Sequence, residues 1–307
     1  MVDNTIPPTM AQGGVGVPMG QPQVNPLKKH LRQPKIYIKL PSQGKYWPQN
    51  SIDIPETGEF PVYAMTARDE ITFKTPDALL NGQATVDVIQ SCVPNIKNAW
   101  MTPSIDLDTL LIAIRMATYG ETIEISTQVP NTQSTRDFGY SLQNIYDHLQ
   151  SAKFETTHKI TGFTVVIKPI TYKVQTEQAT KAFEEQRVFS IIDSDDIDQT
   201  VKLAKFQQAF QKLTDININV LIDSVVSIQP DGDPEAVTNP AYLKDFLDNC
   251  EASVFNQIST CIKAQKEAFA IKPVTIQSDE EEIKAGAPET FEVPITFDQS
   301  NFFGSGS

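Results

Sequence analysis

Apolar residues recur at helical spacing through much of the second half of the chain. One stripe runs from Val201 to Val220 and another from Tyr242 to Phe269. Side chains that repeat every three to four residues lie on one face of a helix, which then buries that face. Helices are therefore predicted over 177–192, 195–228 and 239–269.

A loop rich in proline, aspartate and glycine at 229–234 separates the two stripes. The helices on either side of it are predicted to pack as a helical hairpin. A partner could also occupy the groove between them, although packing within the chain is the favoured interpretation.

The first half of the chain alternates short extended runs with short helical ones. Apolar and polar residues alternate in the extended runs, and proline, glycine and asparagine separate them. Thr75-Pro76-Asp77 has the capping residue, the proline and the acid that favour a helix start. Strands are predicted near 36–40, 60–63, 121–129, 138–142 and 163–167, and helices near 75–82, 85–93, 104–120 and 144–149. The predicted class is α+β, with a mixed core of small antiparallel sheets over 35–175 and a helical region over 176–272.

Both ends of the chain have the composition of extended arms. Residues 1–34 contain many prolines and glycines but few large apolar side chains, so they cannot bury enough surface to offset the entropy of ordering. Residues 273–307 combine an acidic run with apolar residues that suit either strand addition to another chain or docking on the parent fold. The candidate partner-binding residues in this arm are Phe291, Val293, Ile295, Phe297, Phe302 and Phe303.

Charge and composition exclude several classes of protein. The 307-residue chain has a formal charge of −13, which disfavours binding nucleic acid or an anionic membrane surface. Three cysteines are too few for a disulfide framework and favour a reducing compartment. No apolar run is long enough to span a bilayer, and the N-terminal residues do not have the order of a signal peptide. We therefore expect the protein to act inside a cell or in a particle made there.

No motif of catalysis, metal binding or cofactor binding emerges. Loops starting at Asp193 or Asp231 do not have the glycine that an EF-hand requires. Cys250 and Cys261 are expected on one helix, about 16 Å apart along its axis, which makes them buried core thiols. No phosphate-binding loop and no nucleophile elbow is present. We therefore predict no catalytic residue, no cofactor, no metal and no small-molecule substrate.

Several short motifs in the first half occur in a fixed order. The motifs are Leu40-Pro41-Ser42-Gln43-Gly44-Lys45-Tyr46-Trp47-Pro48, Thr75-Pro76-Asp77-Ala78-Leu79-Leu80-Asn81-Gly82, Ser91-Cys92-Val93-Pro94-Asn95-Ile96 and Ala117-Thr118-Tyr119-Gly120-Glu121. Over this region, about a third of its length, the chain resembles the baseplate protein family of T4-like contractile-tailed phages.

The resemblance implies a structural role in a phage tail. Members of this family are tied to the central hub of the baseplate, and some are described as hub assembly chaperones absent from the mature virion. The expected partners are other baseplate and hub proteins, with homo-oligomerisation left open. The expected location is the virion tail baseplate, and the host cytoplasm during assembly.

One departure from the family concerns a turn. Many relatives carry a Cys-Pro-x-Cys knuckle after the Ala-Thr-Tyr-Gly-Glu motif, and such a pair of thiols suits zinc. This chain has Val129-Pro130-Asn131-Thr132 at the corresponding place. We therefore expect the turn to form here without metal.

Removing residues 285–307 is expected from the sequence to leave a folded protein that fails to join its complex, because these residues include the apolar part of the C-terminal arm. Normal assembly of the shortened protein would contradict a role for the arm.

Overall fold

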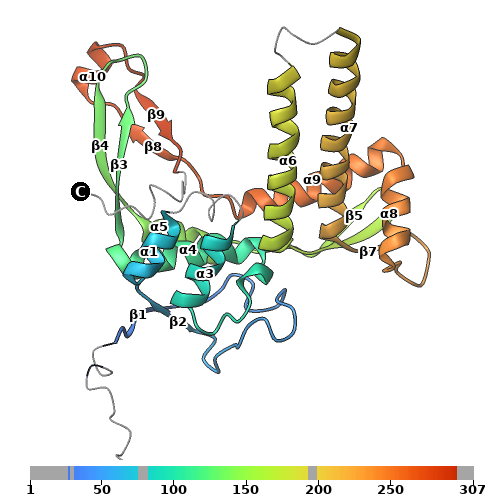
Figure 1. Cartoon of the computed structure of the whole chain (residues 1–307), viewed down its shortest axis with the longest axis horizontal. Helices are drawn as coiled ribbons and strands as arrows, with labels where there is room; N and C mark the ends of the chain where they lie inside the picture. The colour runs from blue at the N-terminus through green and yellow to red at the C-terminus, as the bar shows by residue number, and fades with distance from the viewer. Residues whose placement is uncertain (1–26, 28–30, 75–81, 193–198, 296–307) are drawn as a thin grey trace, which may run out of the picture. The chain divides into compact units, whose positions relative to one another are not determined.

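Figure 1 shows the computed structural model, which describes residues 27, 31–74, 82–192 and 199–295. The helices and strands belong to the compact unit that begins at Gln33. Most of the predicted arm at 1–34, and the predicted helix start at Thr75-Pro76-Asp77, lie outside the described residues. Helices and small antiparallel sheets occur together, which confirms the predicted α+β class.

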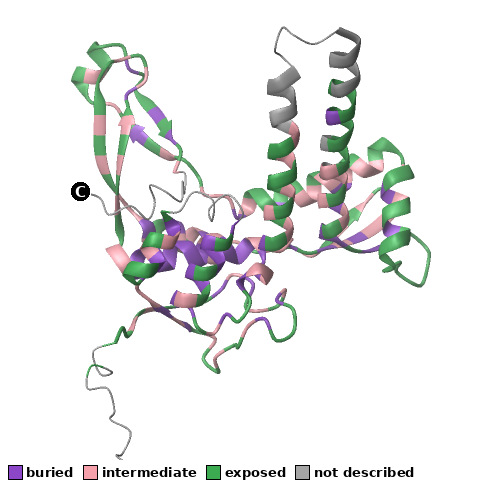
Figure 2. Ribbon diagram, in the orientation of Figure 1, coloured by how far each residue is buried: buried purple, intermediate pink, exposed green. Residues whose placement is uncertain are grey.

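Helix α4 (Ser104–Tyr119) lies at the centre of the largest apolar cluster. It is buried on nearly every side, and Figure 2 shows the buried residues concentrated around it. It packs against α3 (Gln83–Cys92), α5 (Leu142–Ser151) and the antiparallel pair β1 (Pro34–Ile38) and β2 (Phe60–Tyr63). A helix that is apolar all round is a core helix, so the other elements assemble around α4.

The carboxylate of Asp106 connects α4 to the loop that follows β1. Asp106 is fully buried, in the first turn of the helix. The backbone N–H of Ser42 donates to its Oδ1 at 2.8 Å, and the indole N–H of Trp47 donates to its Oδ2 at 2.8 Å. The hydroxyl of Ser42 also donates to Oδ2. A buried carboxylate needs such donors, so the loop and the helix fix each other in place.

Gly44 allows the same loop to make a tight turn. Its φ of +80° lies in the region that favours glycine, and a Cβ there would collide with the side chain of Ile54. Its N–H donates to the hydroxyl of Ser42 at 3.0 Å. The Ser42-Gln43-Gly44 part of the motif is therefore explained by the turn that presents Ser42 to Asp106.

Other short motifs of the first half also contact the chain itself. The hydroxyl of Thr118 accepts from the backbone N–H of Met65 at 3.0 Å. The carbonyl of Asn95 accepts from the N–H of Asp53 at 2.8 Å, and the Asn95 side chain donates back to the Asp53 carbonyl. Gly120 ends α4 with a φ of +93° and a ψ of 179°, a backbone conformation that favours glycine. Each of these hydrogen bonds joins two parts of the same chain.

Helix α1 (Ala67–Phe73) was not predicted. The hydroxyl of Thr66 accepts from the N–H of Asp69, and the Asp69 carboxylate accepts from the N–H of Thr66, which together form a capping box. Asp69 also accepts from the hydroxyl of Ser91 on α3, at 3.0 Å. The Thr66-x-x-Asp69 spacing was therefore a usable signal for the start of this helix.

A second apolar cluster forms around a three-stranded antiparallel sheet. The sheet contains β5 (Thr157–Ile160), β6 (Phe163–Ile167) and β7 (Val225–Pro230), with β6 in the middle. The sequence predicted that residues 225–228 would continue a helix, and this prediction is wrong. Pairing with β6 places Val225 opposite Ile167 and Ile228 opposite Val165, and β-branched side chains fit a pleated surface well.

The long helical hairpin is present, but its members differ from those expected. Helices α6 (Tyr172–Ile192) and α7 (Gln199–Ser224) pack side by side (Figure 1). An ion pair between Lys212 and Glu185, at 2.9 Å, joins them. The C-terminal end of α7 packs on the two helices that follow it in the chain. Leu221 makes this contact, in an apolar cluster that it shares with Leu243 and Ile258.

The stripe from Tyr242 to Phe269 does not form one helix, which corrects a second prediction. It forms α8 (Pro240–Asn249) and α9 (Ala252–Ala268). The side chain of Asn249 bonds the carbonyl of Asp245 and so competes with the helix at that point. Cys250 ends α8 and Cys261 lies in α9; both thiols are free and half-buried, and burial raises their pKa.

Within the described part of the chain, no helix combines the length and the apolar character needed to cross a membrane.

The Asp106 site predicts a specific pH dependence. Burial raises the pKa of Asp106 to about 6, against the opposing effect of hydrogen bonds from Ser42 and Trp47. The folded state therefore binds this proton more tightly than the unfolded state, and the stability gained is lost as pH rises from about 4 to 6. Relative to D106N, which does not titrate here, the unfolding free energy of the native protein should fall by about 2 kcal/mol between pH 4 and pH 7.

Urea unfolding at several pH values measures this difference. Burial also raises the pKa of Asp108 to about 6, but that residue is common to both proteins and cancels. A difference in unfolding free energy that stays constant from pH 4 to pH 7 would contradict the assignment.

Candidate interaction site

The C-terminal candidate residues lie in and beyond a small hairpin. Strand β8 (Val274–Gln277) pairs in antiparallel fashion with β9 (Thr290–Val293), and the five-residue helix α10 (Glu280–Lys284) lies between them. Alternation along β9 puts Phe291 and Val293 on one face and Glu292 on the other. The sequence pattern of this strand is therefore that of a sheet with one buried face.

The buried face of this hairpin packs on a second hairpin from the first half of the chain. That hairpin consists of β3 (Thr122–Gln128) and β4 (Thr135–Ser141), close to the two strands predicted near 121–129 and 138–142. The buried members of the shared apolar cluster are Val129, Ile276, Ala287, Phe291 and Val293. The two hairpins, 122–141 and 274–293, are called here the clasp.

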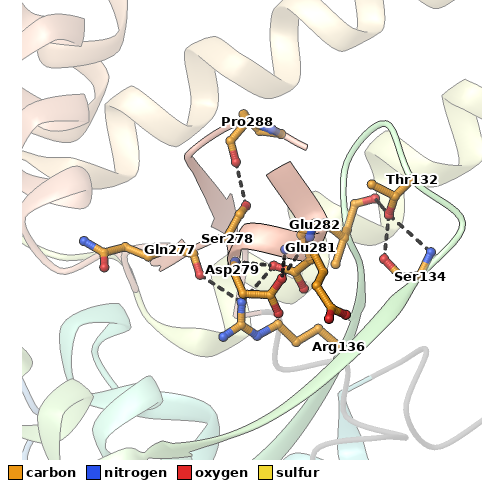
Figure 3. Close-up of polar contacts among 10 residues, drawn as sticks. Thr132, Ser134, Arg136, Gln277, Ser278, Asp279, Glu281, Glu282 and Pro288 are labelled. Carbon is orange, nitrogen blue, oxygen red and sulfur yellow. Dashed lines mark hydrogen bonds and ion pairs between the residues drawn. The ribbon is translucent and has the colours of Figure 1, made fainter. Parts of the chain in front are cut away.

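A polar network joins the two halves of the clasp (Figure 3). The guanidinium of Arg136 on β4 donates to the carbonyl of Gln277 at 2.8 Å and to the carboxylate of Glu282 at 3.1 Å. The Glu282 side chain is only 11% exposed and also accepts from the N–H of Asp279 at 2.9 Å. Charge-assisted hydrogen bonds between partly buried groups fix geometry well, so this contact sets the register of one hairpin on the other.

The acidic run of the C-terminal arm has a local structural role. Asp279 caps α10, because its carboxylate accepts from the N–H groups of Glu281 and Glu282 at 3.0 and 2.8 Å. With the return bond from Glu282, this forms a capping box. The sequence analysis gave this run no role and missed Arg136 and Glu282, although the Asp279-x-x-Glu282 spacing indicated a cap.

The turn at Val129–Thr132 is closed by hydrogen bonds. The hydroxyl of Thr132 donates to the carbonyl of Val129 at 3.0 Å and lies 2.7 Å from the hydroxyl of Ser134. Val129 is fully buried in the clasp. The described residues contain no group of three or more histidine, cysteine or acidic side chains placed to hold a metal ion. Hydroxyls and one apolar side chain thus occupy the turn where relatives are expected to carry thiols.

The predicted partner-binding residues fall into three groups. Phe291 and Val293 are 8% and 4% exposed, and the chain itself covers them. Ile295 is partly buried against the cluster around α4. Phe297, Phe302 and Phe303 lie outside the described residues. Partner binding by any of these residues stays a prediction.

The clasp gives a mutational test. Phe291→Ala should destabilise the packing of the two hairpins by about 3–5 kcal/mol, the usual cost of removing a buried aromatic ring. Glu292→Ala, on the exposed face of the same strand, is the matched control and should have little effect. Hydrogen exchange of the amides in β3, β4, β8 and β9 measures the loss of protection, with α4 as the internal reference. Equal protection in the two variants would show that residues 274–293 do not depend on this cluster.

Comparison with known proteins supplies the family. No curated protein and no solved structure gives a significant match to the chain. A family model described as T4 bacteriophage base plate protein matches residues 33–291. That span contains α4, the Asp106 site and nearly all of the clasp. The chain belongs to the T4 bacteriophage base plate protein family.

Proposed function

We propose that this protein is a non-enzymatic structural component of a contractile phage baseplate, at or near the central hub. Its mechanism is assembly by surface complementarity with other baseplate and hub proteins. The observation that carries the proposal is the family match over residues 33–291. The same match supports a location in the virion tail, reached after assembly in the host cytoplasm. Homo-oligomerisation stays open.

The sequence motifs are used inside the fold, so we expect the surfaces that contact other proteins to lie elsewhere on the protein. Leu40, Ser42 and Trp47 are all nearly buried, so their surface is taken by the chain's own core. Large apolar side chains are instead exposed on the α6–α7 hairpin, where Phe183 is 54% and Phe210 is 62% exposed. Phenylalanine is enriched at protein–protein interfaces relative to other protein surface, so this hairpin is a candidate contact surface.

The proposed organisation has a core over 35–175, a helical region over 176–272 and arms over 1–34 and 273–307. Residues 274–293 of the C-terminal arm are folded into the clasp. The proposed fastening segment is therefore the part after Ile295, which retains Phe297, Phe302 and Phe303. Segments that order on contact can wrap a neighbour and bind it specifically.

Quantitative mass spectrometry of purified mature particles tests the structural role. Peptides from residues 40–272 in fixed ratio to other tail proteins are the expected result. Their absence from particles, with the protein abundant in infected-cell lysate, would overturn the proposal in favour of a hub assembly chaperone that is released.

The fastening segment has its own test. The burial of Phe291 and Val293 means that removal of residues 285–307 would strip the clasp, so the cut belongs after Ile295. Deletion of 296–307 should leave the clasp and the core around α4 folded, as judged by hydrogen exchange of their amides, and should prevent incorporation into particles. Deletion of 304–307 alone, which keeps all the phenylalanines, is the matched control and should assemble normally. Normal assembly of the longer deletion would contradict the role of the segment.

A further inference from the structure

An open groove lies between the short helix η2 (Ala99–Met101) and the first half of α6. Its volume is about 610 Å³, and Trp100 and Met101 line it opposite the α6 residues from Lys173 to Glu184. The ring of Trp100 is half-buried and stacks on Tyr172, with centroids 5.6 Å apart and planes 17° apart. The carboxamide of Asn98 fixes the start of η2 by accepting from the N–H of Trp100. The aromatic side of the groove is therefore held in place before anything binds.

The chemistry of the groove favours a neutral aromatic ligand. Trp100 and Met101 offer a flat, polarisable surface on which another aromatic ring can pack. The α6 side carries Lys173 and Lys181 together with Glu177 and Glu184, so neither sign of charge dominates. A strongly charged ligand would meet repulsion as well as attraction there, whereas an uncharged segment with aromatic side chains would not.

The end of the chain has this chemistry and follows a residue that packs on the same apolar cluster as Trp100. Residues 299–307 contain no charged side chain and include the pair Phe302-Phe303. Ile295 packs on the same apolar cluster to which Trp100 and Tyr172 belong. Phe302 follows Ile295 by seven residues, a span of up to about 24 Å when extended.

We propose that Phe302 and Phe303 of the same chain occupy the groove beside Trp100 in the free protein. This docking covers two aromatic side chains that would otherwise face water and fills a groove that would otherwise stay open. A neighbour that displaces the segment gains access to both surfaces at once. The inference is independent of the proposed baseplate role, because it concerns the isolated chain.

Disulfide trapping in the full-length protein tests the proposal directly. Thr180→Cys on the α6 wall is combined with Gly304→Cys, which leaves Trp100 and both phenylalanines intact. Mild oxidation with oxidised glutathione should join the two introduced thiols within one chain, as identified by peptide mass spectrometry on the monomer band. Ser253→Cys, exposed at the start of α9, replaces Thr180→Cys as the matched control and should not be joined.

The phenylalanines themselves supply the second control. Adding Phe302→Ser and Phe303→Ser should abolish the disulfide, whereas adding Ser300→Ala and Asn301→Ala should leave it. A disulfide that forms only between chains, forms equally with the Ser253→Cys control, or persists without the phenylalanines would overturn the proposal, as would no disulfide at all.

Acrylamide quenching of tryptophan fluorescence gives a readout without engineered thiols. Trp47 is buried, so the change should come from Trp100, and a Trp100→Phe background should remove it. Phe302→Ser with Phe303→Ser should raise the quenching constant in the native background. An unchanged constant would contradict docking beside Trp100.

Discussion

The buried carboxylate of Asp106 is the contact on which the first half of the structure depends. A charge in an apolar interior is tolerated only where donors surround it, and here every donor comes from the loop at residues 42–47. The loop therefore cannot leave α4 without exposing or orphaning the carboxylate. Helices α3 and α5 and the β1–β2 pair all pack on α4. The Asp106 site therefore fixes the loop that joins β1 to β2 against the helix at the centre of the core.

In the clasp, a second polar contact joins the C-terminal part of the chain to the first half. Arg136 and Glu282 are separated by 146 positions in the sequence yet meet at 3.1 Å, beside the apolar contact of Phe291 with the β3–β4 hairpin. Residues 274–293 are thus part of the fold, and the segment available for other contacts begins after Ile295. The proposed roles of that segment, in the groove beside Trp100 and in fastening neighbours, both follow from this boundary.

The sequence predicted those elements whose residue pattern depends only on neighbouring positions. The apolar periodicity of α4 and the alternation in β3 and β4 were enough to identify these elements, because each pattern reflects the burial of one continuous segment. The prediction failed at Val225–Pro230, where apolar spacing suits either structure and only pairing with β6, about sixty positions earlier, selects a strand. For the candidate site, alternation identified Phe291 and Val293 as residues with one face to bury. It could not identify the covering surface, since Val129 and Arg136 are distant in the chain.

We infer that the Leu40–Pro48 motif maintains the fold and is not a docking surface. The free energy of unfolding of Ser42→Ala at pH 7 is the measurement that decides this. Ser42 is 4% exposed, and its hydroxyl donates to Asp106 and accepts from Gly44. We predict a loss of about 1–3 kcal/mol, the usual cost of removing one partner from a buried charged group. A variant as stable as the native protein that nevertheless failed to enter particles would contradict the account and make the motif a contact surface.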